Sequence, residues 1–274
     1  MDNGTLKLKI GGSEDMFFES YPKFERDIIL KAEMLENIKQ YPRDMFRLIY
    51  QDYADGIICG AQVLVEEGRT LVITPGIIKY QGVLYHLPEQ EKIVSEALGV
   101  EQILAVRFLD KEEHVNDILY ATETILKQDS KLGEKEMELC RFILKEGAVL
   151  RKDYQDLRDM ATLHNTVNII EVPYAGKGTD TLSPEITYRF GSEMLKYRLS
   201  DPYDAAFVME CMQKNVMQRE LIEQYIRYRV PNAERGQLTQ KQLHHYLTVI
   251  VDAAKHGGNR NGRMPGGNRR MLVD

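Results

Sequence analysis

The chain has 274 residues, and its 42 acidic and 36 basic side chains give a formal net charge of −6 at pH 7. Nucleic acids and anionic membranes attract basic surfaces, so an acidic body is a poor general scaffold for binding either. A length of this size predicts two domains, or one domain with appendages. The three cysteines, Cys59, Cys140 and Cys211, form no CxxC pair, so we interpret them as free thiols made in a reducing compartment.

No targeting or membrane segment is predicted. The N-terminus lacks the basic start and the apolar stretch of a signal peptide. No apolar run approaches the roughly 20 residues that are needed to span a bilayer. We therefore expect the protein to be made and folded in the cytoplasm, without a signal peptide.

The chain begins with a predicted strand over residues 5–10. Apolar and polar side chains alternate there, which places Leu6, Leu8 and Ile10 on one face. Such a strand can pair with the chain's own sheet or with the open sheet edge of a neighbouring subunit. Both pairings stay open at this point, and the three apolar residues are candidate partner-binding residues.

Two helices are predicted next, over residues 22–39 and 43–53. We expect a break at Tyr41-Pro42, because proline disfavours helix in the residue that precedes it. The two segments would form a helical hairpin or one bent helix. We interpret their aromatic stripe as part of the core, with an interaction surface as the alternative.

Residues 55–88 contain five short apolar runs that are separated by glycine-containing turns, which predicts consecutive short antiparallel strands. Glu67-Gly68 and Gln81-Gly82 suit tight turns, because glycine adopts the positive φ that these turns require. Nothing in the segment has the pattern of a catalytic site.

The turn and strand-end residues of this segment also form a recurring pattern: Asp55-Gly56, Gly60, Thr74-Pro75-Gly76, Gly82 and Tyr85. The pattern resembles a module of baseplate-associated and tail-fibre-attachment proteins, found in phage tails and in related contractile injection particles (tailocins). The segment 139–150 is similar to the strand-then-turn ending of those proteins. The resemblance implies a structural protein without catalytic residues or cofactors, assembled into a tail-like particle (virion). It also implies partners among tail, baseplate or fibre proteins, and a homo-oligomer that is trimeric by analogy.

The centre of the chain predicts further strands with a few helical pieces. A short polar helix is expected over 89–98, and regularly spaced strands over 102–109, 117–127 and 138–144 predict a small sandwich or barrel. Three more elements follow: a short helix over 152–161, a strand over 167–172 and a flexible loop over 174–182.

The C-terminal part predicts a bundle of three capped helices. Ser183-Pro184 starts the first helix, Asp201-Pro202 starts a second that runs to about Arg229, and Thr239 with Gln242 forms a capping-box pattern for the third. Gly257-Gly258 ends the last helix.

The Gly/Arg-rich tail, residues 257–274, carries the arginines of the second candidate partner-binding set: Arg260, Arg263, Arg269 and Arg270. Arginine in an extended tail can form bidentate pairs with carboxylates of a neighbouring subunit. The alternative is binding of single-stranded nucleic acid, although the tail lacks the interleaved aromatic residues that such segments use.

Three weaker patterns do not support catalysis, nucleotide binding or metal binding. Gly176-Lys177-Gly178-Thr179 lacks the Ser or Thr that follows the lysine of a phosphate-binding loop. The six histidines form no HExxH motif and have no cysteine partner at zinc spacing. No pair of acids stands out as the pair that a glycosidase would require.

The sequence therefore predicts an α+β structural protein: a central antiparallel β-rich module between N-terminal helices and a C-terminal helical bundle. The expected domains are 1–53, 54–172 and 173–256, followed by the tail. The predicted function is that of a baseplate or fibre-attachment component that acts through protein–protein interfaces, and not as an enzyme. The alternative is a nucleic-acid-binding accessory protein that uses its basic tail, and a carbohydrate-active enzyme remains a third class.

Overall fold

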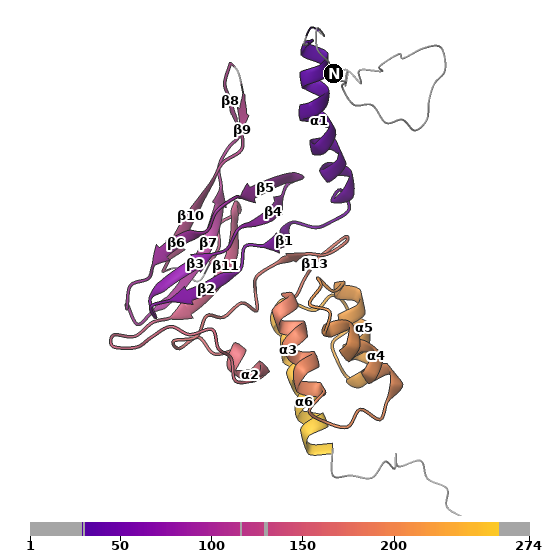
Figure 1. The fold of residues 1–274 in the computed structure, drawn as a ribbon. Coiled ribbons are helices and arrows are strands. Elements are labelled where there is room, and N and C mark those ends of the chain that lie inside the picture. Colours follow the sequence, from indigo (N-terminus) through magenta and orange to yellow (C-terminus); the bar gives the residue numbers. More distant parts are fainter. Residues whose placement is uncertain (1–28, 30, 116, 129–130, 258–274) are drawn as a thin grey trace, which may run out of the picture. The chain divides into compact units, whose positions relative to one another are not determined.

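The computed structural model describes residues 29, 31–115, 117–128 and 131–257 (Figure 1). It divides the chain into two compact units, Met1–Gln51 and Asp52–Asp274. The predicted strand over 5–10, with Leu6, Leu8 and Ile10, lies outside the described residues. The tail arginines Arg260, Arg263, Arg269 and Arg270 lie outside them as well.

The described part of the first unit is dominated by one helix, α1 (Ala32–Ile49). Glu33 in its first turn and Arg47 in its last turn complement the helix dipole. The helix continues through Pro42, so the predicted break at Tyr41-Pro42 is wrong. Proline removes one backbone donor, but an 18-residue helix retains the hydrogen bonds on both sides of that position.

The first sheet of the second unit has the strand order β13-β12-β1-β4-β5. Three of its strands are β1 (Gly56–Gly60), β4 (Gly76–Tyr80) and the edge strand β5 (Val83–Leu87), which confirms strands within 55–88. These three pair antiparallel, whereas β1 pairs parallel with β12 (Tyr174–Ala175). β13 (Asp180–Thr181) completes the sheet, so the predicted flexible loop over 174–182 instead forms two short strands.

Two glycines of the recurring pattern meet across this sheet. Gly60 of β1 pairs with Gly76 of β4, and Gly60 has a φ of 60°. A Cβ atom at Gly60 would lie 1.9 Å from the carbonyl oxygen of Pro75, and one at Gly76 would lie 2.2 Å from the amide nitrogen of Ala61. Any side chain at either position would collide with backbone, which explains both glycines physically.

A second sheet has the order β10-β7-β11, with β7 (Glu101–Phe108) in the middle, β10 (Thr122–Lys127) on one side and β11 (Glu136–Ile143) on the other. Strands were predicted at all three places. The expected single strand over 117–127 is wrong in one respect, because its first part belongs to a separate hairpin of β8 (Glu112–Glu113) and β9 (Ile118–Leu119).

A third sheet joins β2 (Val63–Glu66), β3 (Thr70–Ile73) and β6 (Glu91–Val94) in that order. The helix predicted over 89–98 is therefore wrong. Pairing of β6 with the otherwise open edge of β3 outweighs the weak helical preference of this polar stretch. Because β3 lies in the middle, β2 is an edge strand of this sheet.

The segment between the sheets and the helical part contains α2 (Leu157–Met160), whose N-cap is the side chain of Asp156. This confirms a short helix within 152–161. The strand predicted over 167–172 is wrong: Asn168 forms only an isolated bridge with Arg141 of β11.

Four helices follow where three were predicted: α3 (Pro184–Met194), α4 (Pro202–Cys211), α5 (Arg219–Arg229) and α6 (Gln240–Gly257). The cap of α3 is confirmed, since Ser183 Oγ accepts a hydrogen bond from the amide of Glu185. The capping box of α6 is also confirmed, because Thr239 and Gln242 bond reciprocally. The predicted second helix is interrupted after Cys211, where Lys214 adopts a positive φ of 58°.

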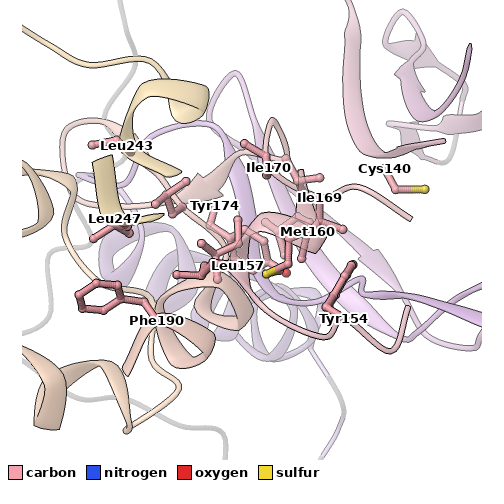
Figure 2. Packing of buried hydrophobic residues seen from close by; sticks show 14 of the residues in the cluster. Cys140, Tyr154, Leu157, Met160, Ile169, Ile170, Tyr174, Phe190, Leu243 and Leu247 are labelled. Atoms are coloured by element: carbon pink, nitrogen blue, oxygen red, sulfur yellow. The ribbon is translucent and has the colours of Figure 1, made fainter. Parts of the chain in front are cut away.

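One hydrophobic core links the sheets of the second unit to its helices. Figure 2 shows Leu157 and Met160 of α2 within a cluster that reaches Phe190 of α3 and Leu247 of α6. The α+β class is confirmed. Of the two predicted arrangements, a sandwich or a barrel, the described strands form no closed barrel.

Candidate interaction surfaces

The apolar face of α1 is the first candidate interaction surface. No residue of the helix is buried, although we expected its stripe to belong to the core. Seven large apolar side chains are between 43% and 61% exposed. They are Leu35, Ile38, Tyr41, Met45, Phe46, Leu48 and Ile49. Contiguous exposed apolar surface of this kind marks an interaction site more often than isolated apolar residues do.

The spacing on α1 is that of a coiled-coil seam. Leu35, Ile38, Met45 and Ile49 occupy successive a and d positions of a heptad repeat, with Pro42 at the remaining a position. Leucine at a with isoleucine at d favours assemblies of three or four helices over two. We call this set, residues 35, 38, 42, 45 and 49, the α1 seam.

The β8–β9 hairpin is the second surface. Every described residue from 109 to 119 is exposed, and Val115 at the tip is 101% exposed. Figure 1 shows the hairpin projecting beyond the ends of β7 and β10. The amide of Leu109 bonds the carbonyl of Ala121 at its base, and the amide of His114 bonds the carbonyl of Asp117 near its tip. We call residues 109–115 with 117–119 the arm.

A groove of about 850 Å³ is the third surface. It lies where edge strand β2 meets the 150–153 segment and the start of α3, and we call it the α3 groove. Its apolar lining comes from Leu64, Val65, Leu150, Pro184 and the ring of Tyr188.

The charged lining of the α3 groove is mostly basic. Lys152 Nζ pairs with Glu185 at 2.7 Å, and Arg151 pairs with Asp159 at 2.6 Å. The pKa of Asp159 falls to about 2, chiefly because Arg151 donates hydrogen bonds to it. Within the described part of the chain, Arg189 forms no ion pair.

The fourth cation of the groove is Lys214. Its Nζ lies 4.2 Å above the ring of Tyr188, and it contacts no carboxylate among the described residues. The groove therefore presents two cations without an acidic partner, Arg189 and Lys214, beside an exposed apolar floor. That combination suits an acidic segment that also carries apolar side chains.

A buried ion network holds the sheets and the helical part together. Arg141 of β11 is 12% exposed and pairs with Glu138 at 2.5 Å, Glu171 at 2.6 Å and Glu101 at 3.0 Å. Lys241 of α6 reaches Glu171 at 2.8 Å. Burial raises the pKa of Glu138, whose side chain is 1% exposed, while the Arg141 hydrogen bond acts in the opposite direction. The guanidinium of Arg141 links β7 to β11, and Glu171 extends the network to Lys241 of α6.

The titratable groups of the second unit give no sign of a catalytic or metal site among the residues that the structure describes. No group of three His, Cys, Asp or Glu side chains there could hold a metal ion. Burial lowers the pKa of His244 to about 4, and its Nε2 atom is buried without a hydrogen-bond partner. Burial likewise raises the pKa of Cys211 to about 12. Buried thiols and a buried neutral imidazole are structural features of a packed core.

The sequence-predicted partner-binding residues are not among these surfaces, because Leu6, Leu8, Ile10 and the four tail arginines lie outside the described part of the chain. The Gly176–Thr179 segment lies at the turn between β12 and β13, where the amide of Gly178 bonds the carbonyl of Asp52. Sequence reasoning missed the arm entirely. The signal for it was the charged run 110–113 between two apolar strands.

No helix in the described ranges is long and apolar enough to cross a membrane. No protein-family model matches the chain, and no curated protein matches it. Among solved structures, the chain is similar to a crystal structure of TssK, with a TM-score of 0.38 and 8% identity, covering 88% of this chain and 72% of that one.

Two further similar structures are baseplate assemblies. One is the TssK–TssF–TssG baseplate subcomplex of the type VI secretion system, with a TM-score of 0.37, 8% identity and coverage of 85% of this chain and 99% of that chain. The other is the type VI baseplate complex, with a TM-score of 0.33, 9% identity and coverage of 86% and 100%. With TM-scores below 0.5, these likenesses carry no argument about the function of this chain.

Proposed function

We propose that this chain is a structural component of a phage-tail-like or contractile injection particle, in a baseplate or fibre-attachment position. It acts by burying its surfaces against neighbouring subunits and not as an enzyme. It is made in the cytoplasm and assembled there into the particle. The exposed seam of α1 is the observation that carries the proposal, because an amphipathic helix without a buried face requires a partner.

The partner for the α1 seam is the same helix of other copies. A heptad repeat complements itself, since each a or d side chain inserts between four residues of an identical neighbour. Leu35 at an a position with Ile38 at a d position favours a coiled coil of three or four helices. A three-helix assembly agrees with the threefold symmetry that the sequence resemblance implies. The opposite face of the helix, with Asn37 and Gln40, is polar.

The resemblance over residues 55–88 supplies the particle class. Its glycines and turn residues lie at both ends of β1, in the β3–β4 connection and in the β4–β5 turn, and Gly60 and Gly76 allow the paired backbones of β1 and β4 to meet. Partners among tail, baseplate or fibre proteins remain part of the proposal. So does docking of the basic tail on carboxylates of a neighbour.

Self-association tests the α1 seam directly. The double variant Ile38→Lys with Met45→Lys adds two charges to the seam, and Asn37→Lys with Gln40→Lys adds the same two charges to the polar face. Lysine is a good helix former, so both variants retain α1. Sedimentation equilibrium should show an oligomer built from three or four α1 helices for the wild type and the polar-face control, and a smaller species for the seam variant. A monomeric wild type, or equal behaviour of the two variants, contradicts the assignment.

The particle class needs a second experiment. Tagged full-length protein, and a form that ends at Gly257, are used to capture partners from a lysate of the native host. Baseplate, tail or fibre proteins identified by mass spectrometry with the full-length form support the proposal. Their loss with the truncated form assigns docking to the tail. Nucleic acid that washes off with salt, in place of those proteins, contradicts the proposal and favours the nucleic-acid alternative.

A further inference from the structure

The arm lacks a packing partner within the described part of its own subunit. Its two strands pair through two residues each, Glu112 with Leu119 and Glu113 with Ile118. A two-stranded hairpin is at best marginally stable in water unless it packs against something else. Its exposed apolar side chains include Val115, Ile118 and Leu119. The arm therefore has both the shape and the apolar content of an element that docks elsewhere.

The arm is also acidic. It contains four carboxylates and one lysine, so the formal charge of its described residues is −3. The carboxylates are Asp110, Glu112, Glu113 and Asp117, and the lysine is Lys111. The ion pairs of this segment are all exposed, including Lys135 with Asp110 and His114 with Glu112. Exposed pairs contribute little stability, so the carboxylates stay available to another partner.

The α3 groove has the complementary properties. Its lining carries four cations against two carboxylates, Asp153 and Glu185, which gives a formal charge of +2 in a chain whose total is −6. The cations without an acidic partner, Arg189 and Lys214, stand beside an apolar floor. Edge strand β2, with Leu64, borders the groove and has one backbone edge that no other described strand covers.

We propose that the arm of one copy of this chain occupies the α3 groove of a neighbouring copy. The carboxylates of Glu112 and Glu113 meet Arg189 and Lys214, and the apolar side chains of the hairpin cover the floor around Leu64. The backbone of the hairpin adds to the open edge of β2, a recurring mode by which an extended segment binds a sheet. Among the surfaces of the described residues, charge complementarity favours this pair.

The fold places the arm and the groove at opposite ends of the same strand. The arm continues from Phe108, the last residue of β7. The groove lies near the other end, where Gly99 bonds Leu144 and Leu150 bonds Gly68. Eight residues of β7 span roughly 25 Å, and Figure 1 shows the arm pointing away from α2 and α3. The arm therefore cannot reach the groove of its own subunit.

The resulting contact is head-to-tail, with different surfaces on the two copies. Such a contact generates a closed ring if the rotation between copies closes, and an open chain if it does not. The arm–groove contact does not involve the α1 seam, which joins identical surfaces. The two proposals can therefore be tested separately.

Zero-length carbodiimide cross-linking tests the contact on the full chain. Protein labelled with ¹⁵N is mixed with unlabelled protein, and cross-linked peptides are identified by mass spectrometry. We expect peptides that join Glu112 or Glu113 of one isotope to Lys214 of the other. The reagent joins a carboxylate directly to an amine, so it reports only groups in contact. Cross-links confined to one isotope, or none to Lys214, overturn the proposal.

An exchange of charges between the two surfaces provides a second test. Glu112→Lys with Glu113→Lys, and separately Arg189→Glu with Lys214→Glu, should each lower the yield of mixed-isotope cross-links at least tenfold. Mixing the two variants should restore cross-linking between them, because the arm then carries the amines and the groove the carboxylates. The control, Glu210→Lys with Glu220→Lys, changes the net charge by the same amount and sign as the arm variant, on exposed parts of α4 and α5, and should have no effect. If the mixture of the two variants does not regain cross-linking, the proposed contact between the arm and the α3 groove is wrong.

Discussion

Replacement of Arg141 by methionine should destabilise the protein by about 3–5 kcal/mol, the cost of leaving a buried charge without its partner. Methionine preserves the length and the apolar stem of the side chain but removes the guanidinium. Glu138, which is 1% exposed, then loses both hydrogen bonds from Arg141. The other two carboxylates suffer less, because Glu101 and Glu171 are more exposed and Glu171 retains Lys241.

The double variant separates the ion pair from simple loss of packing. With Glu138→Met added to Arg141→Met, the buried charge disappears together with its partner, and the total cost should fall to about 0–2 kcal/mol. The two single substitutions are therefore strongly non-additive, with a coupling energy of about 2 kcal/mol or more. Direct contact between Arg141 and Glu138 at 2.5 Å is the reason.

The assay is urea unfolding followed by far-UV circular dichroism, since the chain contains no tryptophan for fluorescence. Arg107→Met is the matched control at the other end of the same strand pair. Arg107 is 42% exposed, and its partner Glu136 retains Lys127 at 2.6 Å, so this substitution should cost about 1 kcal/mol or less.

The pH dependence gives a second check on the same charge. The pKa of Glu138 is already raised by burial, and removal of Arg141 raises it further. The folded state then binds a proton more readily than the unfolded state, so the cost of Arg141→Met should shrink as pH falls from 8 to 5. Additive single effects, a control as costly as Arg141→Met, or a cost that grows on acidification would each refute the reasoning.

Three further outcomes are expected. Gly76→Ala should lower the free energy of unfolding by more than about 2 kcal/mol, because the new Cβ atom would collide with backbone. Gly82→Ala should cost only about 1 kcal/mol, because Gly82 has a φ of 76° but no atom near the position of a Cβ. Equal urea midpoints for the two variants would contradict this expectation. Between pH 7 and pH 4, the wild-type protein should lose about 3 kcal/mol more unfolding free energy than the His244→Gln variant. The reason is that the pKa of His244 is near 6.5 in the unfolded chain and near 4 in the folded one. Parallel stability profiles of the two proteins would exclude the buried neutral imidazole. Only Cys59 should react rapidly with a thiol reagent in the native state, because Cys140 and Cys211 are buried and the pKa of Cys211 is raised to about 12. Rapid reaction of a second cysteine would show that the native structure opens.

Elements defined by local chemistry were predictable from the sequence. The hairpins of residues 55–88 follow from turn glycines, and the starts of α3 and α6 follow from capping residues whose hydrogen bonds involve near neighbours in the chain. These signals act within a few residues, so no distant partner is needed to recognise them. The recurring glycine pattern gains its explanation only in the fold, where Gly60 and Gly76 meet.

Elements defined by distant partners were not predictable in the same way. β6 lies in a polar stretch with helical preference, and it becomes a strand because β3 offers an unpaired edge. The segment over 167–172 is apolar enough for a strand, yet it packs beside β11 through an isolated bridge. The arm was concealed because the apolar residues Ile118 and Leu119 continue directly into the pattern of β10.

The α1 seam shows where sequence periodicity stops being informative. A repeat of apolar residues at three- and four-residue spacing states that one face of a helix avoids water, and it applies equally to a core helix and to a subunit contact. The structure distinguishes them, because none of the 18 residues of α1 is buried, whereas Leu243 and Leu247 of α6 are fully buried. Within the second unit, the acidic arm and the basic α3 groove are charged surfaces that lie apart from its hydrophobic core.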